Sequence, residues 1–232
     1  MIELRDVSAV YPNGTLALGE VNCKIEKGEF VFLVGPTGHG KSSLLKLIHR
    51  ELIPSKGEVR VAGQDTKTLS PRQVAFLRRR VGMIFQDFRL LATRTLWENV
   101  AFALRVTGVS RRRIHRVVPD LLRRVHLSDK ADAFPDQVSA GEQQRAAIAR
   151  ALVNSPAILL ADEPTGNLDT DTGWGIMKLL ADINLSGTTV ICATHNRGIV
   201  QALRRRVITL SHGKIALDVP VGAIRPTASI RI

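Results

Sequence analysis

VSAGEQQR at residues 138–145, followed by ILLADEP at residues 158–164, is the pair of segments that decides the fold of this chain. A glycine-rich loop, GPTGHGKS, stands upstream at residues 35–42, and ATHN follows downstream at residues 193–196. The glycine-rich loop by itself indicates only that a nucleotide binds. An apolar segment that ends in two carboxylates adds groups that can bind a metal and activate water. The order of these segments therefore predicts a nucleotide-hydrolysing α/β domain.

The glycine-rich loop joins an apolar strand, expected at residues 29–34, to a helix that begins at Lys41. Its glycines allow backbone N–H groups to converge on the β-phosphate, and the start of the helix favours an anion. We expect the Lys41 ammonium to neutralise the β- and γ-phosphates and the Ser42 hydroxyl to hold Mg²⁺.

Two carboxylates, Asp162 and Glu163, end a buried strand expected at residues 157–161. Asp162 is expected to bind Mg²⁺ through water, and Glu163 to polarise the attacking water. A salt-bridged pair at the end of a strand is the structural alternative. That alternative does not account for PTGNLD, which follows at residues 164–169.

Ser139 with Glu142 three residues later is a capping box, which predicts a helix over residues 140–153. A capped helix start also presents N–H groups and a hydroxyl that can bind a phosphate. This segment is therefore expected to have both a structural and a nucleotide-binding role.

Strand-like and helical patterns alternate along the chain and predict one α/β domain with a parallel core sheet. The pattern is helical from residue 89 to residue 155, which predicts a helical insertion. Strands are expected at 2–10, 21–25, 29–34, 57–61, 81–85, 157–161, 188–193 and 207–210. Helices are expected at 41–49, from 70, from 95, around 114–125, and at 140–153, 171–183 and 197–203.

The composition limits the compartment and the partners. The chain has 232 residues, of which 44% are hydrophobic, and no apolar run approaches the roughly 18 to 20 residues that span a bilayer. Cys23 and Cys192 lie in apolar segments without a CxxC pair, as expected of buried thiols in a reduced cytosol. The net charge of +12 comes largely from arginine clusters, which suit solvated helix faces or an anionic membrane surface. Nucleic acid is the least favoured partner because few aromatic residues are available to stack on bases.

Taken together, these segments resemble those of the ATP-binding-cassette (ABC) ATPases. The resemblance implies an ABC-type P-loop fold with a parallel core sheet, an N-terminal antiparallel β part and a helical subdomain insertion. It implies one domain over residues 1–218, with a core of 1–88 and 156–218, a helical subdomain of 89–155, and a C-terminal tail of 219–232.

The resemblance also assigns functional residues. Glu163, His195, Gln86 and Lys41 are expected to be catalytic, and Ser42, Gln86 and Asp162 to hold Mg²⁺. Tyr11 is expected to stack on adenine, and Asp169 to communicate across a dimer interface. The residues expected to contact ATP are Tyr11, Gly35, Pro36, Thr37, Gly38, His39, Gly40, Lys41, Ser42, Ser43, Ser139, Gly141 and Glu142.

One position departs from the family pattern. The family has two glycines after the serine of its signature loop, whereas this chain has Ala140 at the first of them. Alanine is acceptable in the first turn of a helix. Its methyl group is nevertheless expected to crowd the approach to the phosphate and to slow hydrolysis.

Within the ABC class, the segments at 82–91, 95–101 and 160–169 are similar to those of the FtsE family of bacterial cell-division ATPases. That similarity implies a homodimer that closes on ATP and an FtsX-like integral membrane partner through which septal peptidoglycan hydrolysis is regulated. It places the protein at the cytoplasmic face of the bacterial cell membrane. The partner is expected to dock near Gln86, Phe88, Leu90, Leu91 and Trp97.

Two other functions stay open from the sequence. Lipoprotein-release and macrolide-export ATPases share much of this pattern. An ATP-gated membrane adapter with low turnover is the other, and Ala140 suits it. A soluble nucleic-acid ABC protein would need a coiled-coil insertion, tandem cassettes or zinc-binding pairs, and the sequence has none of these.

Overall fold

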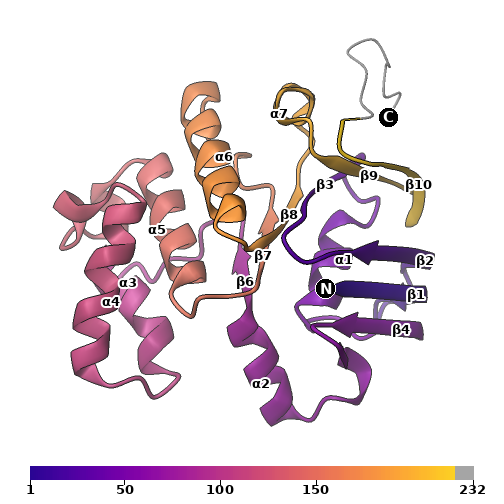
Figure 1. The fold of residues 1–232 in the computed structure, drawn as a ribbon, viewed down its shortest axis with the longest axis horizontal. Coiled ribbons are helices and arrows are strands. Elements are labelled where there is room, and N and C mark those ends of the chain that lie inside the picture. Colours follow the sequence, from indigo (N-terminus) through magenta and orange to yellow (C-terminus); the bar gives the residue numbers. More distant parts are fainter. Residues whose placement is uncertain (223–232) are drawn as a thin grey trace.

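The computed structural model describes residues 1–222, which form two sheets with helices between and beside them (Figure 1). The larger sheet has six strands in the order β10-β9-β3-β8-β7-β6. All neighbours in it pair in parallel except β10, which is antiparallel to β9. The predicted parallel core is therefore confirmed. Its strands are β3 (Phe30–Val34), β6 (Val81–Ile84), β7 (Ile158–Asp162), β8 (Thr189–Ala193), β9 (Arg206–Ser211) and β10 (Lys214–Val219).

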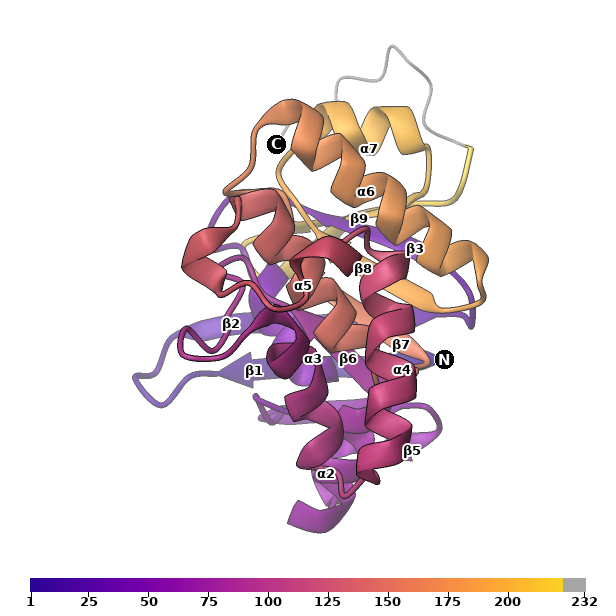
Figure 2. The same ribbon diagram turned by 90° about the vertical axis from the view of Figure 1, so that its left-hand side faces the viewer.

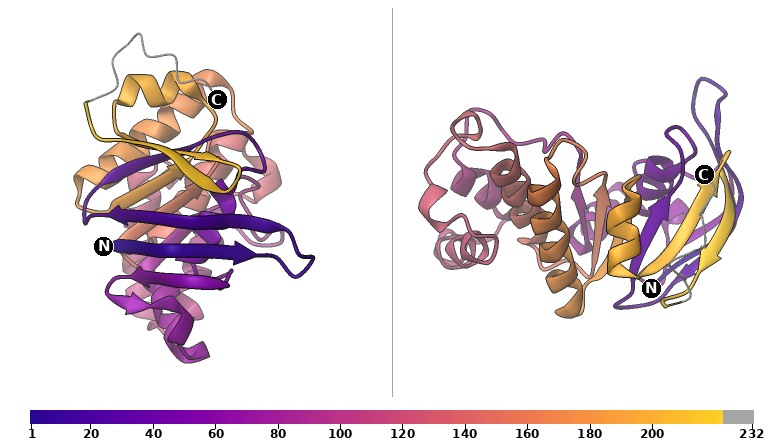
Figure 3. Two further views of the ribbon diagram at one scale, coloured as in Figure 1. Left: turned by 90° about the vertical axis from the view of Figure 1, so that its right-hand side faces the viewer. Right: turned by 90° about the horizontal axis from the view of Figure 1, so that it is seen from above.

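A smaller antiparallel sheet of four strands has the order β2-β1-β4-β5. It lies at the end of the molecule opposite helices α3 to α5 (Figure 3). This is the N-terminal antiparallel part that the family resemblance implies. Its strands are β1 (Ile2–Val10), β2 (Leu16–Ile25), β4 (Lys56–Val61) and β5 (Gln64–Asp65).

Helix α1 (Lys41–Ile48) packs in one hydrophobic cluster with both sheets. Its side chains Leu44, Leu45, Leu47 and Ile48 are all buried, as a helix covered on more than one side requires. Residues 35–40 join β3 to α1, so this packing fixes both ends of the glycine-rich loop.

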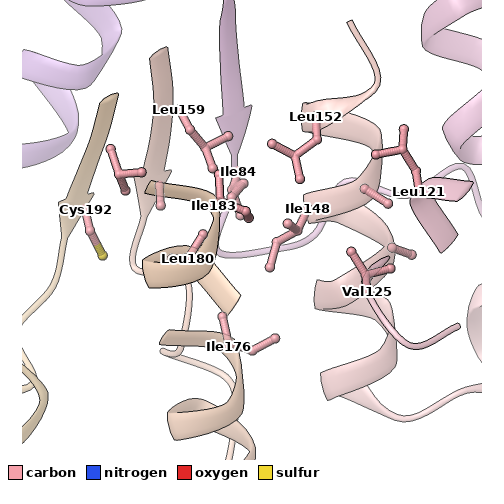
Figure 4. Close-up of a cluster of buried hydrophobic side chains, with 14 of the residues drawn as sticks. Ile84, Leu121, Val125, Ile148, Leu152, Leu159, Ile176, Leu180, Ile183 and Cys192 are labelled. Carbon is pink, nitrogen blue, oxygen red and sulfur yellow. The ribbon is translucent and has the colours of Figure 1, made fainter. Parts of the chain in front are cut away.

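Helices α3 to α7 cover the other face of the parallel sheet, and α3, α4 and α5 lie together beside it (Figure 2). Leu77 of α2 instead packs in the cluster of α1. Ile148 and Leu152 of α5 lie between residues of α6 and residues of the α4 region, such as Ile183 and Leu121 (Figure 4). One continuous hydrophobic cluster therefore joins the helical part to the sheet. The helices are α2 (Pro71–Arg80), α3 (Leu96–Arg105), α4 (Arg111–Arg124), α5 (Ala140–Leu152), α6 (Thr170–Leu185) and α7 (Arg197–Leu203), with short 3₁₀ turns at Thr66–Thr68, Ser128–Lys130 and Pro135–Gln137.

The sequence pattern does not predict the last strand of the described chain, because the last predicted strand ends at 210 and a tail is predicted from 219. Most of β10 is exposed, so no buried face produces the alternation typical of a strand. It is held instead by pairing with β9 and by an ion pair of 2.7 Å between Arg206 and Asp218. The rest of the predicted tail, residues 223–232, lies outside the described residues.

Candidate functional site

The glycine-rich loop leaves β3 and ends at the first turn of α1, as predicted. Gly35 (φ +143°) and Gly40 (φ +103°) adopt backbone conformations that L side chains rarely reach. A Cβ atom on Gly35 would lie 2.2 Å from Leu210 O, so the strands pack too closely for any other residue. Within residues 1–222 no side chain caps the start of α1, and its first turn has no acidic residue. Its free N–H groups can therefore bind an anion.

Lys41, Ser42 and Asp162 meet beside this loop. The Lys41 ammonium, which is buried, donates to Gly35 O at 2.7 Å and Pro36 O at 3.1 Å. The Ser42 hydroxyl donates to Asp162 Oδ1 at 3.0 Å. Burial raises the pKa of Asp162, and the hydrogen bond from Ser42 opposes that shift. A cation at this point would favour the ionised form of the carboxyl group.

Glu163 and His195 meet at the carboxyl ends of neighbouring strands β7 and β8. Glu163 Oε2 lies 2.9 Å from His195 Nδ1 and accepts a hydrogen bond from His195 N at 3.3 Å. Glu163 Oε1 is 3.9 Å from Lys41 Nζ. The backbone of Glu163 is left-handed (φ +47°), and its N–H donates to Ala193 O at 3.0 Å. A carboxylate, an imidazole and an ammonium thus converge on the phosphate side of the sheet.

Gln86 follows β6 at the same edge and lies against the segment after Glu163. The backbone carbonyl of Gln86 accepts a hydrogen bond of 3.0 Å from Asn167 Nδ2. A Cβ atom on Gly166 would lie 3.0 Å from Gln86 Nε2, so glycine allows this close approach. Asp169 caps α6 by accepting from Thr172 N at 2.9 Å, and its hydrogen bonds with Thr172 lower its pKa. Its predicted role across a dimer interface stays a prediction.

A pocket of ≈ 410 Å³ collects most of these side chains. Tyr11 lies in its wall, and its hydroxyl is 3.0 Å from Ser43 Oγ. Three lining residues were not predicted: Thr15, which precedes β2, and Leu16 and Ala17, which begin it. The predicted strand starts only at residue 21. The complete lining is Tyr11, Thr15, Leu16, Ala17, Thr37, Gly38, Gly40, Lys41, Ser42, Ser43, Gln86, Glu163 and His195.

His39 belongs to the loop but does not line the pocket. Its Nδ1 accepts a hydrogen bond of 3.1 Å from His212 N, and the two imidazole rings are 4.5 Å apart between centroids. The side chain therefore ties the loop to the turn between β9 and β10. A contact between His39 and a nucleotide is thus expected from its backbone rather than from its ring.

Residues 138–145, the signature segment, contribute no side chain to this pocket, and Ser139, Gly141 and Glu142 are absent from its lining. Ser139 caps α5 in the predicted capping box, and its hydrogen bonds to Glu142 lower the pKa of that carboxylate. Gly141 is required by packing, because a Cβ atom there would lie 2.4 Å from Thr172 Cγ2. Ser139 and Ala140 are both exposed, so the start of α5 is available to another molecule.

Within residues 1–222, no helix is both long enough and apolar enough to cross a membrane.

Comparison with known proteins identifies the family. The family pattern described as ABC transporter matches residues 18–166. The chain is 49% identical over 218 residues to the cell division ATP-binding protein FtsE of Bacillus subtilis, covering 94% of this chain and 96% of the relative. It is 51% identical over 219 residues to FtsE of Mycobacterium tuberculosis, covering 94% and 95% of the two chains.

The solved structures that this chain resembles are also ATP-binding cassettes. A dimeric post-hydrolysis state of the ATP-binding cassette MJ0796, bound to ADP and Pi, aligns with a TM-score of 0.87 at 36% identity and covers 97% of this chain and all of that one. The cassette cbiO1 of Clostridium perfringens, part of an ABC transporter complex, aligns with a TM-score of 0.86 at 30% identity and covers 94% and 87% of the two chains. This chain is therefore an ATPase of the ABC transporter family and belongs, within it, with the FtsE cell-division ATP-binding proteins.

Proposed function

We propose that the protein hydrolyses ATP as a homodimer, in two composite sites that each join the glycine-rich loop of one copy to the signature segment of the other. The observation that carries this proposal is the separation of Ser139 from the pocket that holds Lys41 and Glu163. The exposed, capped start of α5 suits a phosphate held by a second copy. The dimeric state of the cassette MJ0796 with ADP and Pi supports the same arrangement.

The residues beside the loop suit Mg²⁺. Ser42 Oγ and Asp162 Oδ1 are 3.0 Å apart, and both are the oxygen donors that Mg²⁺ prefers. Ser42, Asp162 and Gln86 are the residues that would hold the ion. When bound, it supplies positive charge next to the β- and γ-phosphates. Lys41 adds a second positive charge at the same phosphates.

Glu163 is the group that orients and polarises the attacking water. Its carboxylate is fixed by His195 N and Nδ1 and faces Lys41, so it can accept hydrogen bonds from water near the γ-phosphate. His195 contacts the γ-phosphate, and its contact with Glu163 couples that phosphate to the base. Tyr11 packs on the adenine at the other end of the pocket.

Replacing Ala140 with glycine should raise the ATPase rate if the methyl group obstructs the signature segment. The helix penalty of glycine is at most about 1 kcal/mol and is smaller in the first turn, so the fold should persist. Steady-state ATP turnover of Ala140→Gly against the parent protein tests this. Equal turnover would show that the segment already accommodates alanine.

We further propose that the ATPase works at the cytoplasmic face of the bacterial membrane, with an FtsX-like integral membrane partner through which septal peptidoglycan hydrolysis is regulated. Its similarity to the cell division ATP-binding proteins supports this over a lipoprotein-release or macrolide-export role. The exposed arginines at the start of α4 can add attraction to anionic lipid worth about 1 kcal/mol each near the surface. A low-turnover adapter remains the second candidate because of Ala140. Turnover measured with and without the membrane partner separates the two.

The partner is expected to dock against the loop after β6, beside the helical part. Leu90 and Trp97 pack partly against the core, whereas Leu91 is 38% exposed and can provide an apolar contact. The division into a core of 1–88 and 156–218 and a helical subdomain of 89–155 places this dock between two parts that could move relative to each other. That division is part of the proposal.

Leu91→Asp should release the protein from membranes that contain the partner, with binding weakened about tenfold or more, as for a contact at the centre of an interface. ATP affinity should not change, because Leu91 does not line the pocket. Co-sedimentation with such membranes measures the first and a nucleotide titration the second. Leu185→Asp, an exposed leucine at the end of α6, is the matched control. If membrane binding survives Leu91→Asp but is lost in high salt, the arginines and not a partner groove hold the protein there.

A further inference from the structure

The loop after Gln86 contains two successive residues in an uncommon backbone conformation. Phe88 (φ +56°) and Arg89 (φ +50°) are both left-handed, a region that residues other than glycine rarely adopt. Such a conformation persists only where the surroundings hold it.

Arg150 of α5 provides the restraint. Its Nη2 donates to Phe88 O at 2.7 Å, and its Nη1 donates to Arg89 O. One planar guanidinium thus binds the carbonyls of both left-handed residues. The Arg89 side chain folds back on the same loop, with its guanidinium 3.8 Å from the centre of the Phe85 ring and 3.2 Å from Asp87 Oδ1.

The charge of Arg150 also indicates that it binds the carbonyls of this loop. The side chain is partly buried, and within residues 1–222 it forms no salt bridge. Burial lowers the pKa of Arg150, and the nearby positive charge of Arg89 lowers it further. Buried cations are normally paired with carboxylates. For Arg150, the carbonyls of Phe88 and Arg89 replace a carboxylate as the partner of the charge.

The same helix also holds the segment after the catalytic carboxylate. The fully buried Gln144 donates from Nε2 to Pro164 O at 2.7 Å, next to Glu163. Helix α5 therefore carries Ser139 at its start and binds both the loop after Gln86 and the segment after Glu163.

We propose that Arg150 is a positioning residue that holds the loop so that Gln86 reaches the metal and water of the ATP site. The inference rests on the role of Gln86 in the proposed function. Because Arg150 touches neither the pocket nor the glycine-rich loop, its loss should leave ATP binding in place. It should displace Gln86, as loss of a residue that orients a metal ligand does.

A double-mutant cycle between Arg150→Ala and Gln86→Ala tests the proposal. Arg150→Ala should lower kcat about 10- to 100-fold with a KM for ATP within about threefold of the parent. In the Gln86→Ala background it should cause no further loss, because both changes remove the same contact. Arg150→Lys keeps the charge but cannot bind two carbonyls in parallel, so it should restore kcat only in part. Arg72→Ala, an exposed arginine of α2, is the control and should not change kcat.

The outcomes separate the inference from its premise. Suppose that Gln86→Ala lowers kcat, and that Arg150→Ala lowers kcat by the same factor in the parent protein and in the Gln86→Ala protein. Arg150 then does not act through Gln86, and the inference fails while the proposed function stands. If Gln86→Ala leaves kcat unchanged, the role given to Gln86 in the proposed function is wrong, and the inference falls with it. Should Arg150→Ala not fold, Arg150→Lys carries the same cycle. Full activity of that folded variant would overturn the inference.

Discussion

Glu163→Gln should stop hydrolysis while leaving ATP bound. The amide can still accept a hydrogen bond from His195 N, but it polarises water poorly, so turnover should fall by about 10²- to 10⁴-fold. Ser42, Asp162 and Lys41 are unchanged and should hold the nucleotide and its metal. The dimer should therefore accumulate with ATP, because its opening requires ATP hydrolysis.

The mass of Glu163→Gln in solution, measured with ATP and with ADP, checks this expectation. A dimer with ATP and a monomer with ADP is the expected pair of results. Glu20→Gln, a change at an exposed carboxylate of β2, should behave as the parent protein. A variant that stays monomeric with both nucleotides would argue against the composite site.

Lys41→Ala should abolish useful ATP binding and turnover. The ammonium of Lys41 is buried and donates to the loop carbonyls Gly35 O and Pro36 O. Removing a preorganised charge beside developing phosphate charge costs about 3–4 kcal/mol of transition-state stabilisation, or roughly 10²–10³ in rate.

ATP titration and steady-state turnover of Lys41→Ala measure both effects. Lys67→Ala changes an exposed lysine outside the pocket and controls for the general loss of positive charge. Near-normal turnover of Lys41→Ala in a folded protein would contradict the assignment of the glycine-rich loop.

The elements of the fold that have a buried face could be predicted from the sequence. The apolar runs at β3, β7 and β8 and the capping boxes of α2, α3 and α5 are local signals, and the structure contains all of them. Strand β10 and the start of β2 could not be predicted in this way. The side chains of β10 are mostly exposed, and the first residues of β2 break the alternation.

In the site, too, local sequence signals predict some features and not others. Asp162 and Glu163 could be placed at the phosphate end of the sheet because they end a buried strand, whereas the role of His195 follows from the family resemblance. The hydrogen bonds of Arg150 to the loop carbonyls could not be predicted, because they join side chain and backbone 61 and 62 residues apart. The contact of His39 with His212 could not be foreseen for the same reason, since it spans 173 residues.

Cross-linking between copies tests the composite ATP site most directly. Thr37 and Ser139 are both exposed, and both should approach the same ATP from different copies. The native thiols Cys23 and Cys192 are buried, and burial raises the pKa of each, so they should not react. The experiment mixes Thr37→Cys with Ser139→Cys, both in the Glu163→Gln background, and adds a short bis-maleimide. We expect a covalent dimer with ATP, little with ADP, and little from either variant alone. A yield that does not depend on ATP, or no cross-link while both variants bind ATP, would contradict the account.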